Sequence, residues 1–438
     1  MGLGTSESVT RRRRAAAKHP PADLPRFRRF FADLGPGLIT GAADDDPSGI
    51  STYSVAGARF GYMPLWTAIV SFPLMAAVQL MCARLGMVTG LGLAGVIRRR
   101  YSRWVLWGAC VLLVVANVIN IAADLGGMAE ATAIMTGAPV AASVPVFGIA
   151  MVAALMWSSY RTLARVFKWL TLVLLAYVAT AFVAHADWRT AVSMTIVPRL
   201  EWSRSFFSVL VAILGTTISP YLFFWQAAQE VEEERAMGRN LAHRRGATPV
   251  ELTACRTDVL TGMFASNAIM YFIILTTAAT LHAHGHTNIS TAQEAAGALR
   301  PLAGGGAYAL FTLGLIGTGM LAVPVLAGSC AYAIAEAAAW RGSLNQRPHR
   351  AKKFYIVLGV AMALGIALTY TGMNAIALLF GAAVINGVLA PPLILIVLLL
   401  TRDRDVMGDN INSRALACCG WAAFAVMIVA AVGLFVAR

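Results

Sequence analysis

Two short stretches combine proline with oxygen-bearing groups inside apolar sequence, and the first contains Asp44, Asp45 and Asp46 directly before Pro47. Proline has no N–H and clashes with the preceding turn, so Pro47 leaves the carbonyl of Ala43 without its helical partner. Carboxylate and carbonyl oxygens together are the ligands of a hard cation. Carboxylates cost about 2.5–3.5 kcal/mol each near the centre of a membrane helix, so we expect them to face a cavity or a cation.

The second stretch reads Thr216-Thr217-Ile218-Ser219-Pro220. Pro220 frees the carbonyl of Thr216, and the hydroxyl of Ser219 falls on the same face of the helix. The simplest interpretation is a proline kink repaired by Thr and Ser hydroxyls, which is common in membrane helices. The acidic break earlier in the chain favours a second role, in which the Thr216 carbonyl and the Ser219 hydroxyl help to bind a cation.

Both stretches lie in apolar segments long enough to cross a bilayer, which takes about 20 residues. The chain holds eleven such segments, of which the first, sixth and eighth are interrupted by Gly, Pro or polar residues: 34–58, 62–89, 103–127, 138–160, 165–185, 204–229, 257–281, 305–338, 354–371, 373–400 and 415–437. The first and sixth hold equivalent places in two five-helix halves. Such paired interruptions point to a midplane binding site in an inverted-repeat transporter. We therefore expect an all-α integral membrane protein with helices 1 and 6 broken.

The segments predict one membrane domain with short flanking pieces. These are a basic cytosolic tail over 1–33, a ten-helix transport core over 34–400 with repeats at 34–185 and 204–400, a cytosolic loop over 401–414 and an eleventh membrane helix over 415–438. In the tail, four arginines are followed by Lys18, two prolines and Asp23 instead of an apolar run. We therefore expect a cytosolic tail and not a cleaved signal peptide.

Composition and charge agree with a membrane protein. Of 438 residues, 58% are hydrophobic and only 13% charged, whereas soluble domains have about 25% charged residues. The net charge of +14 could indicate a nucleic-acid binder, but the basic residues lie between the apolar segments. With the N-terminus in the cytosol, 28 Lys and Arg lie inside and 6 outside, as the positive-inside rule requires. We expect a multi-pass cell-membrane protein with its C-terminus outside, no nucleic-acid ligand and no obligate protein partner.

Other polar residues admit two interpretations each. Asp44 and Asp45 would add negative potential or hold water near the cation, or one of them would pair with Arg84 of the second span. Asp124 in the third span would line the inner pathway or bond a neighbouring helix. The run from Glu230 to Arg235 is expected to extend the sixth helix as a solvated turn.

The histidines and cysteines give weaker signals. His282, His284 and His286 would share one face of a strand and form a metal-ligand set, but Gly285 and Asn288 favour a plain solvated loop. Six cysteines without CxxC spacing are predicted to be buried thiols and not disulfides or metal ligands: Cys82, Cys110, Cys255, Cys330, Cys418 and Cys419.

At the two breaks the sequence resembles the Nramp family of divalent-metal transporters over about residues 30–400. That family has the LeuT-like fold and carries Asp-Pro-Gly-Asn in helix one and Ala-x-x-Met-Pro-His in helix six. The resemblance implies that Asp46 is the metal-binding carboxylate and that Thr216 supplies a backbone carbonyl. The family's Asn position is Gly49, and its Met position is Ser219.

These departures change the expected cargo. Thioether ligands select softer metals, whereas sites built from oxygen suit Mg²⁺, Ca²⁺ or Mn²⁺. Mg²⁺ gives up its water reluctantly, and small residues at Gly49 and Ser219 would accept a partly hydrated ion. The pattern looks like the Nramp-related magnesium transporters, so we expect uptake of Mg²⁺, and of Mn²⁺, by alternating access. The ion is cargo, and no cofactor is expected.

Further departures concern protons. The family's helix-six His is Tyr221 here, and the Glu of its helix-three Asp-x-x-Glu pair is lost at Gly127, although Asp124 is kept. Coupling to protons is therefore in doubt. The family's helix-ten Gln falls near Ala383 or Val384, and Asn386, about one turn away, would supply a polar lining instead.

Three other functions fit the pattern less well. A proton-coupled Mn²⁺ or Fe²⁺ transporter would be the ordinary Nramp activity. A sodium-coupled transporter of an organic solute on the same fold would need a larger cavity with donors for the solute. A membrane enzyme that binds Mg²⁺-pyrophosphate through Asp44 to Asp46 would need a second Asp-rich motif, and Asp124 stands alone. We expect a transporter and not an enzyme.

Overall fold

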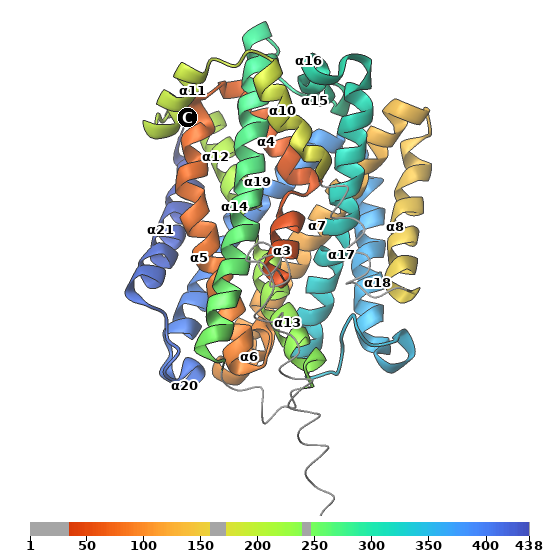
Figure 1. Cartoon of the computed structure of the whole chain (residues 1–438). Helices are drawn as coiled ribbons and strands as arrows, with labels where there is room; N and C mark the ends of the chain where they lie inside the picture. The colour runs from red at the N-terminus through yellow and green to blue at the C-terminus, as the bar shows by residue number, and fades with distance from the viewer. Residues whose placement is uncertain (1–34, 158–171, 239–246, 438) are drawn as a thin grey trace, which may run out of the picture.

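The computed structural model describes residues 35–157, 172–238 and 247–437, which form a bundle of helices running up and down beside one another (Figure 1). No strand occurs in these ranges. The main helices are α3 (Pro36–Asp44), α4 (Pro47–Phe60), α5 (Trp66–Thr89), α6 (Leu93–Arg100), α7 (Arg103–Thr136), α8 (Val140–Trp157), α10 (Leu175–Val183), α11 (Trp188–Ile196), α12 (Arg204–Thr217), α13 (Pro220–Ala236), α14 (Pro249–Thr280), α15 (Ala292–Ala296), α16 (Arg300–Ala303), α17 (Ala307–Ala337), α18 (Lys352–Thr369), α19 (Ala375–Arg402), α20 (Arg404–Met407) and α21 (Arg414–Val436).

Nine helical segments in the described ranges are long and apolar enough to cross a membrane. The first predicted span is not among them, because Pro47 divides it into the short helices α3 and α4. Part of the fifth predicted span, 165–185, and all of the basic tail over 1–33 lie outside the described residues. What is described of the fifth span leads into α11 through a bend of 116°.

Several predicted helix limits differ from the structure. The eighth span forms one unbroken helix, α17, although Pro324 lies inside it; neighbouring helices and side-chain hydroxyls can satisfy the carbonyl that a membrane proline frees. The predicted connection 186–203 contains α11. The third span continues to Thr136, and the seventh begins at Pro249, eight residues earlier than expected. There, Thr248 and Glu251 form a capping box that lets the helix start in polar sequence.

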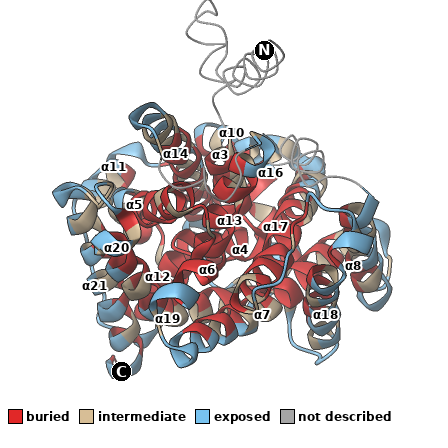
Figure 2. Ribbon diagram, turned by 90° about the horizontal axis from the view of Figure 1, so that it is seen from below, coloured by how far each residue is buried: buried red, intermediate tan, exposed pale blue. Residues whose placement is uncertain are grey.

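Buried residues concentrate around α4, α13 and α17, while α8, α18 and α21 at the rim carry more exposed positions (Figure 2). The exposed side chains on the rim helices include large apolar ones, such as Ile149 of α8 and Phe435 of α21, which are 65% and 72% exposed. An apolar outer surface of this kind suits contact with lipid.

Helix α14 packs along both halves of the broken first span and against α5. It meets α3 backbone to backbone: a Cβ placed on Gly41 would lie 2.3 Å from the carbonyl oxygen of Gly262, and one on Gly262 would lie 2.2 Å from that of Gly37. Small residues permit this close approach between membrane helices. The carboxylate of Asp258 on α14 accepts hydrogen bonds from the N–H groups of Gly35, at 2.8 Å, and Gly37, at 2.6 Å. The first half-helix is therefore fixed to α14.

Candidate cation site

The break in the first span is two residues long. Helix α3 ends at Asp44, α4 begins at Pro47, and Asp46 is the N-cap of α4. One carboxylate oxygen of Asp46, Oδ1, accepts hydrogen bonds from the backbone N–H of Gly49 and the hydroxyl of Ser48, both at 2.7 Å. Asp46 is only 2% exposed. These contacts fix the carboxylate at the positive end of the α4 dipole.

Gly49 takes part in this arrangement through its backbone. Its N–H points at Asp46, and a Cβ at this position would lie 3.4 Å from Oδ1 of Asp46 and from the ring of Tyr53. The residue adds no side-chain ligand, in agreement with the loss of the amide expected from the sequence. Its contribution is to orient Asp46.

The break in the sixth span is also two residues long. Helix α12 ends at Thr217 and α13 begins at Pro220. The hydroxyl of Ser219 lies 2.6 Å from the carbonyl oxygen of Thr216 and 2.9 Å from that of Gly215, and donates to them. The Ser219 hydroxyl therefore satisfies the carbonyl that Pro220 frees, as the simplest interpretation of the sequence expected. Each carbonyl oxygen has two lone pairs, so the Thr216 carbonyl keeps the capacity to bind a cation.

Hydrogen bonds connect the two broken spans. The Tyr221 hydroxyl on α13 donates to the carbonyl oxygen of Ala43 on α3 at 2.9 Å, and both residues are buried. Ala43 is the residue whose carbonyl Pro47 frees. In a second bond, the Thr216 hydroxyl donates to that of Tyr53 on α4 at 3.1 Å. The structure thus brings together the two stretches that the sequence singled out, about 170 residues apart.

Asp44 and Asp45 contact α14. The hydroxyl of Ser266 donates to Oδ2 of Asp44 at 2.6 Å and lies 3.1 Å from Oδ1 of Asp45. The alternative in which one of them pairs with Arg84 is wrong, because the Arg84 guanidinium donates to the carbonyls of Asn410 (2.9 Å) and Ile411 (3.3 Å). Nothing in the sequence marked Ser266 as a partner, since it is one hydroxyl in a long apolar helix.

Asp124 and Asn386 lie in different surroundings. Asp124 is fully buried, and neither carboxylate oxygen has a hydrogen-bond partner among the described residues. Asn386 on α19 exchanges two hydrogen bonds with Asn120 on α7, at 3.0 and 3.1 Å. This closed amide pair joins the two helices and leaves the expected role of Asn386 as a pathway lining without support from its contacts.

The prediction that the acidic end of α13 is solvated is wrong. Glu230, Glu232 and Glu234 were expected to be solvated, but they are 6%, 3% and 2% exposed. Glu230 accepts from Gln226 at 2.9 Å, and Glu232 accepts from Ser343 at 2.5 Å. The helix does extend as predicted; Ser343 and Asn345 of the segment after α17 bond Glu232, and Glu230 lies beside Cys255 of α14.

The weaker sequence signals form no metal site in the described ranges. The three loop histidines lie in and after a short 3₁₀ turn (His282–His284), not in a strand, and no described group of three His, Cys, Asp or Glu could hold a metal ion. Four of the six cysteines are buried and all are free, whereas Cys418 is exposed and Cys419 half-buried. The expectation of buried thiols fails for these last two, which lie near the start of α21.

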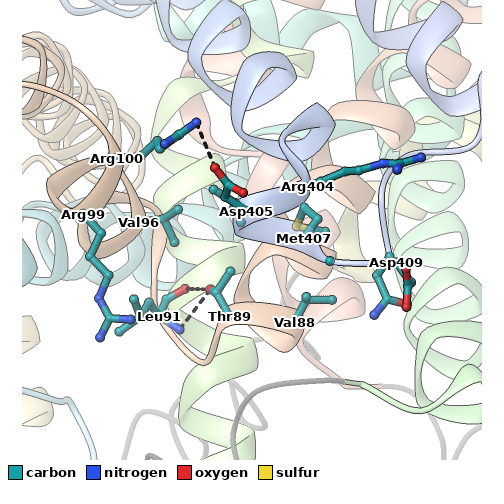
Figure 3. Close-up of a pocket in the computed structure, with 13 residues that line it drawn as sticks. Val88, Thr89, Leu91, Val96, Arg99, Arg100, Arg404, Asp405, Met407 and Asp409 are labelled. Atoms are coloured by element: carbon teal, nitrogen blue, oxygen red, sulfur yellow. Dashed lines mark hydrogen bonds and ion pairs between the residues drawn. The ribbon is translucent and has the colours of Figure 1, made fainter.

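A cavity of about 560 Å³ lies away from the breaks, between the end of α5, α6 and the segment around α20 (Figure 3). Its charged lining is partly paired, since Arg100 of α6 bonds Asp403 at 2.5 Å and Asp405 at 3.3 Å. These ion pairs join the two segments at the end of the bundle. The cavity does not include any of the residues expected to bind the cation.

A family model described as natural resistance-associated macrophage protein-like, Nramp, matches residues 37–437. The chain belongs to the Nramp family. Among its relatives is a divalent metal cation transporter, MntH, of Verminephrobacter eiseniae, 26% identical over 413 residues that cover 91% of this chain and 89% of the relative. Another MntH, of Xanthomonas campestris, is 29% identical over 316 residues and 69% of each chain.

Solved structures of Nramp proteins have the same fold. The manganese transporter of Eremococcus coleocola superimposes with a TM-score of 0.72 at 19% identity, covering 95% of this chain and 89% of that one. Mhp1, a nucleobase-cation-symport-1 family transporter, gives a TM-score of 0.55 at 14% identity, with 91% and 90% covered. The predicted all-α, LeuT-like membrane fold with broken first and sixth helices is confirmed.

Proposed function

We propose that this Nramp protein carries a divalent metal cation across a membrane, and that Asp46 with the carbonyls freed by Pro47 and Pro220 binds the ion. The hydrogen bond from Tyr221 to Ala43 carries the proposal, because it holds the two breaks against each other with their oxygens inside the bundle. The curated relatives named above are divalent metal cation transporters, which supports the same cargo class.

We further propose that the main transported ion is Mg²⁺ and that Mn²⁺ is a second substrate. The four half-helices α3, α4, α12 and α13 contain neither Met nor Cys, so the groups they offer are oxygens, which suit hard cations. One thioether lies nearby: Met128 of α7 and the ring of Pro47 both border Gly319. Substitution of Met128 by Leu therefore tests whether sulfur takes part in selection.

The two breaks supply hinges for alternating access. The linkers at Asp45 (φ −82°, ψ 51°) and Ile218 (φ −118°, ψ 58°) lie outside the helical region. Helix α3 is fixed to α14 by Asp258 and by the glycine contact, and Tyr221 joins α3 to α13. We propose that α3 and α13 move with α14 while the linkers absorb the change in backbone angles.

We propose that no proton accompanies the ion. A phenol does not titrate near neutral pH, and the Tyr221 hydroxyl is engaged as a donor to Ala43. The charge distribution supports a cell-membrane location with the N-terminus inside.

The test is ion flux into proteoliposomes loaded with an ion-sensitive dye and, separately, a pH dye. We expect wild type to take up Mg²⁺ and Mn²⁺ with little Cd²⁺ and no change in internal pH, and Asp46→Ala to lose uptake. Asp187→Ala is the matched control, because Asp187 is an exposed cap of α11 remote from the breaks. Met128→Leu should keep the selectivity of wild type.

Each rival predicts another result. Acidification with Mn²⁺ uptake, and none with Mg²⁺, would support an ordinary proton-coupled Nramp transporter. Equal flux in wild type and Asp46→Ala would refute the site. Sodium-dependent uptake of a labelled organic solute without metal flux would support the solute transporter.

A further inference from the structure

A buried carboxylate outside the four half-helices has unused oxygens. Asp124, on α7, is fully buried, and neither Oδ1 nor Oδ2 has a hydrogen-bond partner among the residues that the structure describes. Burial of an ionised carboxylate without a partner costs several kcal/mol, so such groups are normally paired or bind a cation. Among the described residues Asp124 has the backbone N–H of Ser48 as a polar neighbour, and no cationic side chain pairs with it.

The position of Asp124 follows from its neighbours on α7. A Cβ built on Gly319 of α17 would lie 2.8 Å from Cγ of Met128 and 3.2 Å from Cγ of Pro47, so α7 and the start of α4 meet at Gly319. Met128 is one turn after Asp124 on the same face of α7. The Asp124 carboxylate lies near the backbone N–H of Ser48 and close enough to the Asp46 carboxylate for their negative charges to repel each other. It therefore faces the first turn of α4, where Asp46 is the cap.

The other carboxylates at the break are more fully used. Oδ1 of Asp46 accepts from Ser48 and Gly49. Asp44 and Asp45 are tied to Ser266 of α14, although Oδ1 of Asp44 has no hydrogen-bond partner. A divalent ion beside Asp46 alone would keep one uncompensated positive charge in a buried site. A second carboxylate would neutralise it, and Asp124 is the one with both oxygens available.

We infer that Asp124 supplies the second negative charge of the cation site, bound to the ion directly or through a retained water on the side opposite α13. The inference rests on the proposed function and extends it. The site is then formed by three elements: the break before α4, the break before α13 and the middle of α7. Asp124 would act on the ion itself and would not serve as a bond between helices.

The test separates a cation ligand from a structural group by measuring thermal stability with and without cation. Purified wild type, Asp124→Asn, Asp44→Asn and Asn117→Ala are heated in detergent with MgCl₂ or MnCl₂ against NaCl of equal ionic strength. A ligand stabilises the folded protein that binds it, by an amount that grows with the logarithm of the ligand concentration divided by Kd. Asn117 is the control: it is buried on the same helix, and its amide donates to the carbonyl of Leu326 at 2.9 Å.

We expect Asp124→Asn to keep or raise the stability without cation, because it removes an unpartnered charge. The same variant should bind Mg²⁺ and Mn²⁺ on the order of 10–100-fold more weakly. Asn117→Ala should show the reverse, with lower stability without cation and an unchanged cation effect. Asp44→Asn should keep most of the cation effect.

Three results would overturn the inference: a wild-type cation effect in Asp124→Asn, a fall in its stability without cation like that of Asn117→Ala, or a loss of affinity found in Asp44→Asn instead. Absence of any cation effect and any flux in wild type would refute the proposed function itself. The two failures are thus distinguishable.

Discussion

At the scale of single residues, hydroxyl groups determine how the two breaks are built. Ser48 and Gly49 orient Asp46, Ser219 donates to the Thr216 carbonyl, and Tyr221 donates to the Ala43 carbonyl. Each freed carbonyl therefore has one hydrogen bond and one lone pair left. A cation would find these oxygens already in place, which lowers the cost of organising the site.

Ser219→Met tests whether position 219 faces the ion. The change replaces a hydroxyl with a thioether, which favours softer metals. We expect the flux ratio of Cd²⁺ to Mg²⁺ in proteoliposomes to rise and that of Mn²⁺ to Mg²⁺ to rise less. An unchanged series of ratios would show that the side chain at position 219 does not contact the cargo.

Tyr221→Phe removes the hydroxyl and keeps the ring. The bond to Ala43 is buried, so its loss should lower the free energy of unfolding by about 0.5–1.5 kcal/mol. Thermal unfolding in detergent measures this, and flux should remain independent of internal pH. A Phe variant as stable as wild type would mean that the hydroxyl does not hold α3 to α13.

At the scale of elements, proline made the breaks predictable, because its missing N–H acts locally. Contacts between distant segments were not predictable in this way. From the sequence Asn386 was expected to line the pathway, but it pairs with Asn120, and Glu232 was expected to be solvated, but Ser343 of the segment after α17 bonds it.

The backbone contact between α3 and α14 gives a second kind of prediction. Gly262→Ala would place a Cβ 2.2 Å from the carbonyl oxygen of Gly37, and such overpacking typically costs about 1–3 kcal/mol. We expect a lower unfolding temperature and reduced flux. Gly359→Ala on α18 is the control, because a Cβ there meets nothing within 4 Å; it should be neutral or stabilising. Equal unfolding temperatures for the two variants would argue against a tight contact.

At the scale of the whole molecule, the inverted-repeat fold was predictable because membrane spans leave long apolar runs and charge marks their ends. The family match over residues 37–437 and the structural likeness agree with that prediction. The family match and the fold do not distinguish one divalent ion from another, so the identity of the cargo depends on the side chains at the breaks. The orientation of the protein in the membrane likewise follows from the distribution of Lys and Arg between the loops and not from the fold.

Orientation can be measured by labelling single cysteines in intact cells with a membrane-impermeant thiol reagent. In a background lacking Cys418 and Cys419, Ser290→Cys between α14 and α15 should react from outside. Gln346→Cys between α17 and α18 should react only after the membrane is opened. The reverse pattern would place the N-terminus outside.

The most direct test of the central claim is an experimental structure of the protein with Mn²⁺, in which the ion is located by its anomalous X-ray scattering. We predict a peak between the breaks, next to the Asp46 carboxylate and on the side facing Asp124, and none in Asp46→Ala. A peak that stays in Asp46→Ala, or that lies elsewhere in the bundle, would contradict the account.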